Sequence, residues 1–271
     1  MEIILHFGAH RCATTSFQEY MRCNAQPLAA QGIAFWGPET TRETGLYGLK
    51  SMTDQSRAAL QDDLEKCRAK GVRHLLISEE NFLGMMQQNV NMTGLYPEAR
   101  LRGQLLAAAF GDGVAKIALN IRALNTYWPS VAGFAVRNRK GFGKKIRWNR
   151  ITQNPRSWRD VITDLSLAFP EIPLVALPFE EFAGHPDAQL ATILDCDAPQ
   201  NASNIWLSRD DQDETPGPSG AGDMQLVAKY ADDLDWLAAG ADGLAQLGLL
   251  PNTARGEATD APSEFDERIT Q

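Results

Sequence analysis

The sequence of 271 residues has 44% hydrophobic and 22% charged residues, enough apolar side chains to bury a sizeable core. Its four cysteines form no C-x-x-C pair, which argues against both a disulfide framework and a cysteine-ligated zinc site. No apolar stretch reaches membrane-spanning length and no leader precedes the first strand pattern, so we expect a soluble, cytoplasmic protein.

The formal net charge of −8 hides an uneven distribution of charge along the chain. Residues 100–160 contain thirteen Lys and Arg and two Asp, a net charge of +11, whereas residues 208–271 contain four basic and fourteen acidic residues, a net charge of −10. The middle of the chain is therefore predicted to face anions. Because the sequence pI is about 5.1 and no nucleic-acid recognition motif is present, a small polyanionic ligand fits this pattern better than nucleic acid.

Apolar runs typical of buried strands recur along the chain, and segments of helical periodicity separate them. We expect strands at residues 3–7, 33–36, 74–78, 115–121 and 173–177, and helices at residues 18–31, 55–70, 157–169 and 224–239. This alternation predicts an α/β fold of three layers, with a central, mainly parallel sheet covered by helices. We expect residues 1–250 to form this single domain, with a polar loop at residues 208–223 and a disordered tail at residues 251–271.

The first predicted strand leads into a loop with the features of an anion-binding site. Residues 2–19 read EIILHFGAHRCATTSFQE, an apolar run followed by a glycine, a basic residue and hydroxyl side chains before a helical pattern. The unpaired N–H groups and the dipole at the start of a helix bind an anionic group. Gly8 lets the backbone approach closely and Arg11 supplies charge, while the hydroxyl donors are Thr14, Thr15 and Ser16.

This loop lacks the lysine of the Walker A motif of nucleotide triphosphatases, G-x-x-x-x-G-K-[ST]. After Gly8, the four residues A-H-R-C lead to Ala13-Thr14, where that motif has Gly-Lys. The segment instead resembles the 5′-phosphosulfate loop of the sulfotransferases, whose common form is K-x-G-T-T. In this comparison Arg11 takes the place of the lysine, Ala13 that of the glycine, and Thr14-Thr15 that of the paired threonines.

The resemblance implies a P-loop-like α/β topology and the donor 3′-phosphoadenosine 5′-phosphosulfate (PAPS), whose product is 3′-phosphoadenosine 5′-phosphate (PAP), without a metal. It also implies sulfuryl transfer to a hydroxyl of a carbohydrate or another small acceptor, anionic if the basic middle of the chain faces it. Because Arg11 takes the place of the family's lysine, it is also among the expected catalytic residues. Arginine keeps the positive charge of that lysine but not its proton chemistry. The residues expected to hold the 5′-phosphosulfate are Gly8, Arg11, Cys12, Ala13, Thr14, Thr15 and Ser16.

A second motif follows the fourth predicted strand, in the sequence LNIRALNTYWPS. Arg122 ends this strand, and Ser130 lies in the next predicted helix. The pair resembles the 3′-phosphate motif of sulfotransferases, R-D-P followed by a serine, although Ala123-Leu124 replaces Asp-Pro. The resemblance implies that Arg122 and Ser130 bind the 3′-phosphate of PAPS. Because ligands of parallel sheets sit beyond the carboxyl ends of the strands, we expect strands one, three and four to end around one crevice.

The third predicted strand ends in LLISEENF, which places Glu79 and Glu80 at the mouth of the same crevice. In the sulfotransferases that the chain resembles, a His or a Glu near this strand end is the base for the acceptor hydroxyl. Adjacent residues leaving a strand point in different directions, so we favour Glu80 as the base, with Glu79 and His10 as alternatives. Acidic residues are also ordinary in the first turn of a helix, where they interact with its dipole. The charge of Arg11 should lower the pKa of His10 and keep its imidazole neutral.

Several features have more than one reading. The basic run at residues 137–150 is either a solvated loop or one that guides an anionic acceptor. Cys12 is either a reactive thiol at a helix N-terminus or a small residue that fits the loop. After the fifth predicted strand, Phe179, Glu180 and Phe182 are expected to serve packing and loop anchoring.

Two rival functions remain beside the sulfotransferase prediction. One is a P-loop kinase or other nucleotide-binding protein, and the other is a nucleotide-binding module without activity.

Overall fold

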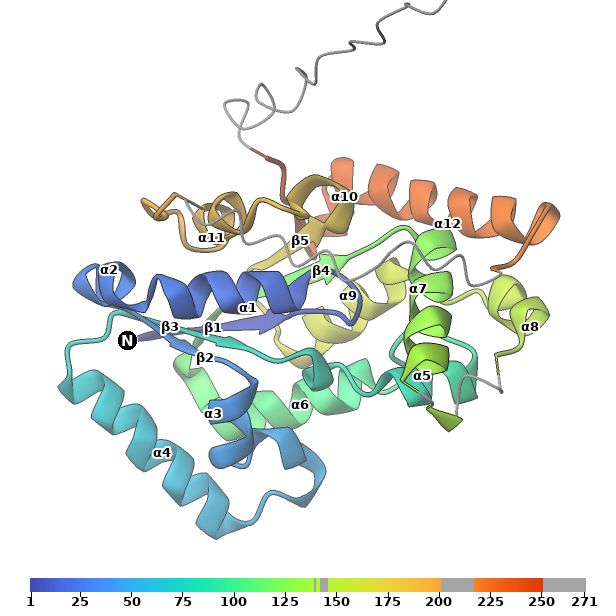
Figure 1. The fold of residues 1–271 in the computed structure, drawn as a ribbon. Helices are drawn as coiled ribbons and strands as arrows, with labels where there is room; N and C mark the ends of the chain where they lie inside the picture. Colours follow the sequence, from blue (N-terminus) through green and yellow to red (C-terminus); the bar gives the residue numbers. More distant parts are fainter. Residues whose placement is uncertain (139, 142–145, 201–216, 251–271) are drawn as a thin grey trace, which may run out of the picture.

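A six-stranded sheet forms the centre of the computed structural model, which describes residues 1–138, 140–141, 146–200 and 217–250. Within these residues the strand order is β2-β3-β1-β4-β5-β6, and every pair of neighbours is parallel (Figure 1). The predicted parallel sheet is therefore confirmed, and only the two-residue β6 was too short to be predicted. The strands are β1 (Glu2–Phe7), β2 (Ile33–Trp36), β3 (His74–Ser78), β4 (Val114–Ile121), β5 (Leu174–Pro178) and β6 (Gln246–Leu247).

Helices cover both faces of the sheet and so give the three layers predicted from the sequence (Figure 1). α1, α2, α10 and α11 pack on one face, and α4, α6 and α9 pack on the other. The helices are α1 (Thr14–Cys23), α2 (Ala25–Ala30), α3 (Pro38–Glu43), α4 (Asp54–Ala69), α5 (Met86–Met92), α6 (Ala99–Phe110), α7 (Leu124–Arg137), α8 (Trp148–Gln153), α9 (Trp158–Ala168), α10 (Phe179–Phe182), α11 (Pro186–Leu194) and α12 (Ala221–Ala238). Short 3-10 helices include η1 (Leu46–Ser51) and η2 (Glu80–Phe82).

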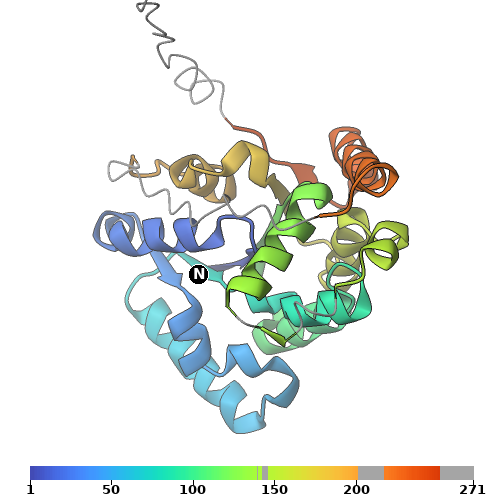
Figure 2. The ribbon, with the colours of Figure 1, turned by 45° about the vertical axis from the view of Figure 1, so that its right-hand side comes forward.

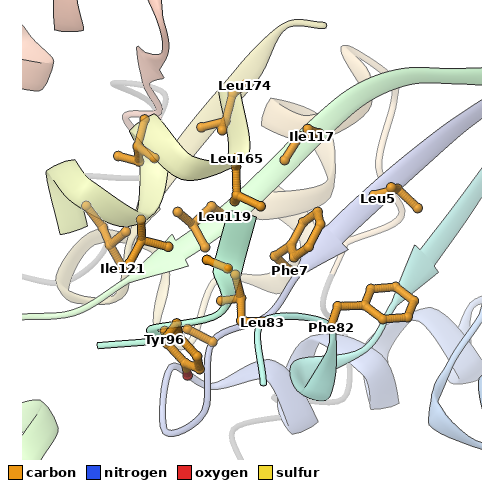
Figure 3. Packing of buried hydrophobic residues seen from close by; sticks show 14 of the residues in the cluster. Leu5, Phe7, Phe82, Leu83, Tyr96, Ile117, Leu119, Ile121, Leu165 and Leu174 are labelled. Atoms are coloured by element: carbon orange, nitrogen blue, oxygen red, sulfur yellow. The ribbon is translucent and has the colours of Figure 1, made fainter. Parts of the chain in front are cut away.

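Alternating side chains of the strands build a separate core on each face of the sheet. In β1, Leu5 and Phe7 belong to the larger core and Ile4 to the smaller one. Figure 3 shows the larger core, where Phe7 of β1, Leu119 of β4 and Leu165 of α9 come together. Both faces are apolar because helices cover both, which is why these strands read as nearly continuous apolar runs.

The single helix predicted over residues 18–31 is wrong, because the chain forms two helices that meet at Asn24. Pro27 explains the break: it has no N–H to donate to the carbonyl of Cys23, and its ring would clash with that carbonyl in a continuous helix. The side-chain amide of Asn24 donates to the carbonyl of Tyr20 at 2.9 Å and so helps to end α1. The other predicted helices correspond to α4, α9 and α12, with small differences at their ends.

Some predicted segments lie outside the described residues. These include the expected tail at residues 251–271 and most of the expected polar loop at residues 208–223. The last residues of that loop are described and lead into α12, which begins at Ala221. Positions 139 and 142–145 of the basic run also lie outside. The predictions for those positions remain predictions.

β1 lies between β3 and β4, so the carboxyl ends of these three strands are neighbours. α7 follows β4 directly and stands in front of these ends, as Figures 1 and 2 show. The loop after β1, the turn after β3 and the start of α7 therefore meet at one edge of the sheet. This is the convergence that the sequence predicts.

Asp233 of α12 caps the start of α9. Its carboxylate accepts hydrogen bonds from the hydroxyl of Ser157 at 2.5 Å, from the N–H of Trp158 at 2.9 Å and from the N–H of Arg159 at 3.3 Å. Only 3% of Asp233 is exposed. The indole of Trp158 in turn donates to the carbonyl of Arg122 at 2.7 Å. The packing of α12 on α9 thus supports the end of β4 that carries Arg122.

Replacing Asp233 with alanine should lower the free energy of unfolding by about 2–3 kcal/mol, because buried donors at the start of α9 lose their acceptor. Asp233→Asn should restore little of it, since the amide turns an N–H toward one of those donors. Urea unfolding followed by tryptophan fluorescence measures both effects. The matched control is Asp232→Asn on the exposed side of α12; it should unfold at the wild-type urea concentration, and a wild-type midpoint for Asp233→Ala would contradict the capping role.

Candidate active site

The loop between β1 and α1 has a backbone suited to an anion. Arg11 and Ala13 adopt left-handed conformations, with φ of 63° and 58°. Backbone in which left-handed residues alternate with others turns successive N–H groups into one concavity. In the described part of the chain, no side chain caps the N-terminus of α1. The first N–H groups of this helix are therefore available to a ligand.

Gly8 and the two threonines divide their tasks in a way the sequence does not show. A Cβ on Gly8 would lie 2.2 Å from Cγ2 of Thr14, so a glycine is required for the threonine to close against the strand end. The hydroxyl of Thr14 donates to the carbonyl of Ala9 at 3.2 Å and so holds the loop itself. Thr15 is exposed at the first turn of α1, whereas Ser16 is buried. Of the three predicted hydroxyl donors, Thr15 is the one that faces outward.

Arg11 joins the two motifs that the sequence analysis treats separately. Its Nε donates to Oγ of Ser130 at 2.8 Å, although the two residues are 119 positions apart. Its guanidinium carbon lies 5.7 Å from the ring centre of Phe134, one turn further along α7. The side chain of Arg11 thus lies along α7. The loop and this helix form one cationic and hydroxyl-bearing surface.

Arg122 holds the loop from beneath. Its Nη1 donates to the carbonyl of Arg11 at 2.7 Å, and its Nε donates to Oγ1 of Thr126 at 3.1 Å. Its guanidinium stacks 4.2 Å above the ring centre of Phe179, and only 7% of the residue is exposed. The sequence predicts that Arg122 contacts a phosphate. The structure adds that it fixes the left-handed turn at Arg11.

Glu180 provides the anchoring predicted for the segment after β5. One carboxylate oxygen accepts from the N–H of Ala123 at 2.8 Å, and the other accepts from the hydroxyl of Tyr230 at 2.7 Å. Phe182 is buried in the smaller core, 2% exposed. The start of α7 is thereby tied both to α10 and to α12, which keeps Ser130 in place.

The two carboxylates after β3 have different surroundings. Glu79 is 0% exposed, and its Oε1 accepts from the N–H and the side-chain amide of Asn81 at 3.0 and 2.7 Å. Its Oε2 accepts from the hydroxyl of Thr41 at 2.7 Å. Glu80 is partly exposed, and its Oε2 lies 3.4 Å from the amide nitrogen of Gln18. Both oxygens of Glu79 are thus used inside the fold, which leaves Glu80 as the carboxylate that can reach a ligand.

Arg102 of α6 fixes the turn that carries these carboxylates. Its Nε donates to the carbonyl of Phe82 at 2.9 Å and its Nη2 to that of Asn81 at 2.6 Å. Nothing near Arg102 in the sequence distinguishes it from an ordinary helical arginine.

A buried polar network lies under the site, on the face of the sheet that α1 and α11 cover. His6 donates from Nε2 to Oδ1 of Asn120 at 2.5 Å, and its Nδ1 accepts from the hydroxyl of Ser78 at 2.8 Å. The Ser78 hydroxyl accepts in turn from the amide of Gln18 at 3.2 Å. Burial lowers the pKa of His6 to about 4. Each of the three strands has one of these polar residues near the carboxyl end of its apolar run, His6, Ser78 and Asn120, and this is the pattern in the sequence from which the network could have been found.

The two remaining candidates of the loop are turned into the fold. Burial is the largest cause that lowers the pKa of His10, to about 4, while Arg11 contributes less than the sequence analysis assumes. Cys12 is 1% exposed, and its N–H donates to the carbonyl of Ala9 at 3.2 Å. Burial raises the pKa of the Cys12 thiol. Cys12 therefore fits the packing interpretation, and a reactive thiolate is not supported.

Across residues 1–138, 140–141, 146–200 and 217–250, no group of three or more His, Cys, Asp or Glu side chains is placed to hold a metal ion. The same residues include no helix long and apolar enough to cross a membrane.

The fold of the chain is similar to that of a solved bacterial sulfotransferase. The sulfotransferase from Alicyclobacillus acidocaldarius superposes on the chain with a TM-score of 0.49 at 15% sequence identity, over 89% of this chain and 96% of that one. No family model matches the sequence, and no curated protein matches it either. A likeness at this level leaves the function to be argued from the residues of the site.

The left-handed loop can be tested through Ala13. Glycine adopts positive φ without a Cβ penalty, so Ala13→Gly should raise the free energy of unfolding by up to about 1 kcal/mol. As a control, Ala59→Gly on the exposed side of α4 should lower it by about 1 kcal/mol. Urea unfolding of both variants and wild type gives the comparison. A loss of stability in Ala13→Gly would contradict the left-handed backbone at this position.

Proposed function

We propose that the chain is a sulfotransferase that moves the sulfuryl group of PAPS to a hydroxyl of a carbohydrate or another small acceptor. The observation that carries this proposal is the 2.8 Å hydrogen bond between Arg11 and Ser130. Each residue comes from a different motif, one expected at the 5′-phosphosulfate and the other at the 3′-phosphate. Their contact means that a single ligand with both groups can engage both motifs at once.

The groups around the loop suit such a ligand. The uncapped N–H groups of α1, the exposed hydroxyl of Thr15 and the guanidinium of Arg11 would hold the 5′-phosphosulfate. Ser130 and Arg122 would hold the 3′-phosphate, with Arg122 also keeping the loop in shape. Arginine forms planar, bidentate hydrogen bonds with phosphate oxygens, so it can replace a lysine in binding.

These residues would act mainly by positioning the donor and by stabilising the negative charge of the sulfuryl group during transfer. When bound, PAPS supplies an activated sulfuryl group whose transfer spreads negative charge over its oxygens, as in phosphoryl transfer. The N–H groups of the loop and Arg11 are fixed before the reaction and can stabilise that charge. Glu80, at the carboxyl end of β3, would accept the proton of the acceptor hydroxyl. Its neighbour Gln18 restrains the carboxylate from the side of α1.

The loop lacks the residue that the rival function, a P-loop kinase, requires. A P-loop kinase uses a lysine that reaches the terminal phosphates of its nucleotide. Here the position after Ala13 is Thr14, whose hydroxyl is engaged with the carbonyl of Ala9. The cation of the loop is Arg11, which lies along α7. The other rival, a nucleotide-binding module without activity, would bind PAP through the same loop but would transfer no sulfuryl group.

Ligand-induced thermal stabilisation separates these functions. Millimolar PAP should raise the melting temperature of the full chain, because it binds the folded protein through both motifs. ATP with Mg²⁺ should raise it less, since it lacks the 3′-phosphate for Ser130 and Arg122. The Ser130→Ala variant should lose most of the difference. Stabilisation by ATP with Mg²⁺ alone would overturn the proposal. Stabilisation by neither nucleotide would also overturn it, because the chain would then have the fold without the binding site for the donor.

Substitution of Glu80 tests the proposed base. Glu80→Gln should lower the turnover of PAPS by about 100-fold or more, with a panel of saccharides and phenols as acceptors, because the amide cannot accept the proton. Its PAP-induced thermal shift should remain that of the wild type. Glu65→Gln, an exposed carboxylate on α4, is the matched control and should keep full turnover. Unchanged turnover in Glu80→Gln would exclude Glu80 as the base.

A further inference from the structure

Two buried tyrosines lie beneath the loop between β1 and α1. The hydroxyl of Tyr96 accepts from the N–H of His10 at 2.9 Å and lies 3.1 Å from Nδ1 of the same residue. The hydroxyl of Tyr127 lies 3.4 Å from that of Tyr96 and accepts from the amide of Asn89 at 3.0 Å. All three partners of this cluster, Asn89, Tyr96 and Tyr127, are 0% exposed. In Figure 3 the Tyr96 hydroxyl points toward the loop that follows β1.

The contacts of this cluster favour one assignment of donors and acceptors. Asn89 accepts the N–H of Tyr96 with Oδ1, so its amide nitrogen is the donor to Tyr127. The hydroxyl of Tyr127 then donates to Tyr96. Since the Tyr96 oxygen already accepts from Tyr127 and from the backbone of His10, its own proton goes to Nδ1 of His10. A neutral imidazole whose Nδ1 accepts carries its proton on Nε2.

The surroundings of His10 keep it neutral. Its pKa is lowered to about 4, first by burial; the hydrogen bond to Asn81 and the charge of Glu79 raise the pKa, and the charge of Arg11 lowers it. The ring is 8% exposed and stacks on Tyr96 with 6.1 Å between ring centres. A histidine that stays neutral and whose Nδ1 is occupied by the Tyr96 hydroxyl is poorly suited to accept a proton from a substrate.

The position of Tyr96 is itself enforced. Its φ is 38°, a left-handed value that is unfavourable for a bulky residue. Arg156 donates to the carbonyl of Leu95 and, at 2.9 Å, to the carbonyl of Tyr96. Asn89 holds the N–H of Tyr96 at 3.0 Å. These contacts hold the backbone in a conformation that aims the Tyr96 hydroxyl at His10.

We propose that His10 is a positioning residue, held by Tyr96 as the Nε2–H tautomer, which fixes the loop between β1 and α1 on the buried hydroxyl of Tyr96. The assignment of this loop to the sulfuryl donor rests on the proposed function. The tautomer and its cause do not. His10, named with Glu79 as an alternative base in the sequence analysis, thereby receives a structural part in the reaction.

Nitrogen NMR of the full chain tests the tautomer independently of activity. In protein labelled with ¹⁵N-histidine, the signals that disappear in His10→Gln should report a neutral Nε2–H imidazole that does not titrate between pH 6 and 8. Tyr96→Phe should convert them toward a mixture of tautomers, because Nδ1 loses its donor. Tyr20→Phe, the matched control, removes a hydroxyl that donates to the carbonyl of Pro199 and does not contact His10, so it should keep the tautomer. A cationic ring at pH 7, or an Nδ1–H tautomer, would overturn the proposal.

Two substitutions of His10 distinguish positioning from proton transfer. The amide oxygen of His10→Gln can accept from the Tyr96 hydroxyl as Nδ1 does, so its kcat should stay within about threefold of wild type. His10→Ala should lose about tenfold or more in kcat, with a smaller change in the KM for PAPS. Equal and large losses in both variants would mean that His10 exchanges protons.

The failure of this inference can be told apart from the failure of the proposed function. If the wild-type protein binds no PAP and transfers no sulfuryl group, the proposed function fails while the NMR result stands. If the wild-type protein is active and both variants match its kcat, the inference alone fails.

Discussion

The left-handed backbone of the loop after β1 is the constraint on which the site depends. Arg11 and Ala13 both have positive φ, and neither is a glycine. A residue with a Cβ loses about 1–2 kcal/mol in this conformation, so the loop keeps its shape only because neighbouring elements hold it. Arg122 at the end of β4 holds the carbonyl of Arg11, and Tyr96, placed before α6, holds the N–H of His10. The N–H groups that would meet an anion are therefore oriented before any ligand arrives.

These supports extend far from the loop itself. Arg122 stacks on Phe179 and has its carbonyl bound by Trp158, and the helix that begins at Trp158 is capped by Asp233 of α12. Glu180 ties the start of α7 to α12 through Tyr230. The last described helix thus contributes to the placement of residues in the first loop. Substitutions of Tyr230 or Asp233 in α12 should consequently affect both stability and ligand binding.

The parts of the fold that the sequence predicted are those that follow from short segments. Five strands were predicted from apolar runs. The convergence of the loop after β1 with the start of α7 was anticipated because both follow the carboxyl ends of parallel strands, but the hydrogen bond between Arg11 and Ser130 was not. The continuous helix at residues 18–31 was wrong because the effect of Pro27 on the carbonyl of Cys23 outweighs the helical periodicity around it. Tyr96 and Arg102 were missed, since neither a tyrosine before a helix nor an arginine within one carries a local mark of a partner 86 or 20 positions away.

The sequence by itself determined the layers, the loop after β1 and the set of polar residues at the carboxyl edge, because periodicity and short motifs act within a few neighbouring residues. Only the tertiary structure decided the surroundings of each of those residues. The sequence favours Glu80 but keeps Glu79 as an alternative, whereas in the folded chain Thr41 and Asn81 use both oxygens of Glu79 and leave Glu80 partly exposed. Burial and hydrogen-bond partners set these roles, and both depend on elements that only the folded chain brings together.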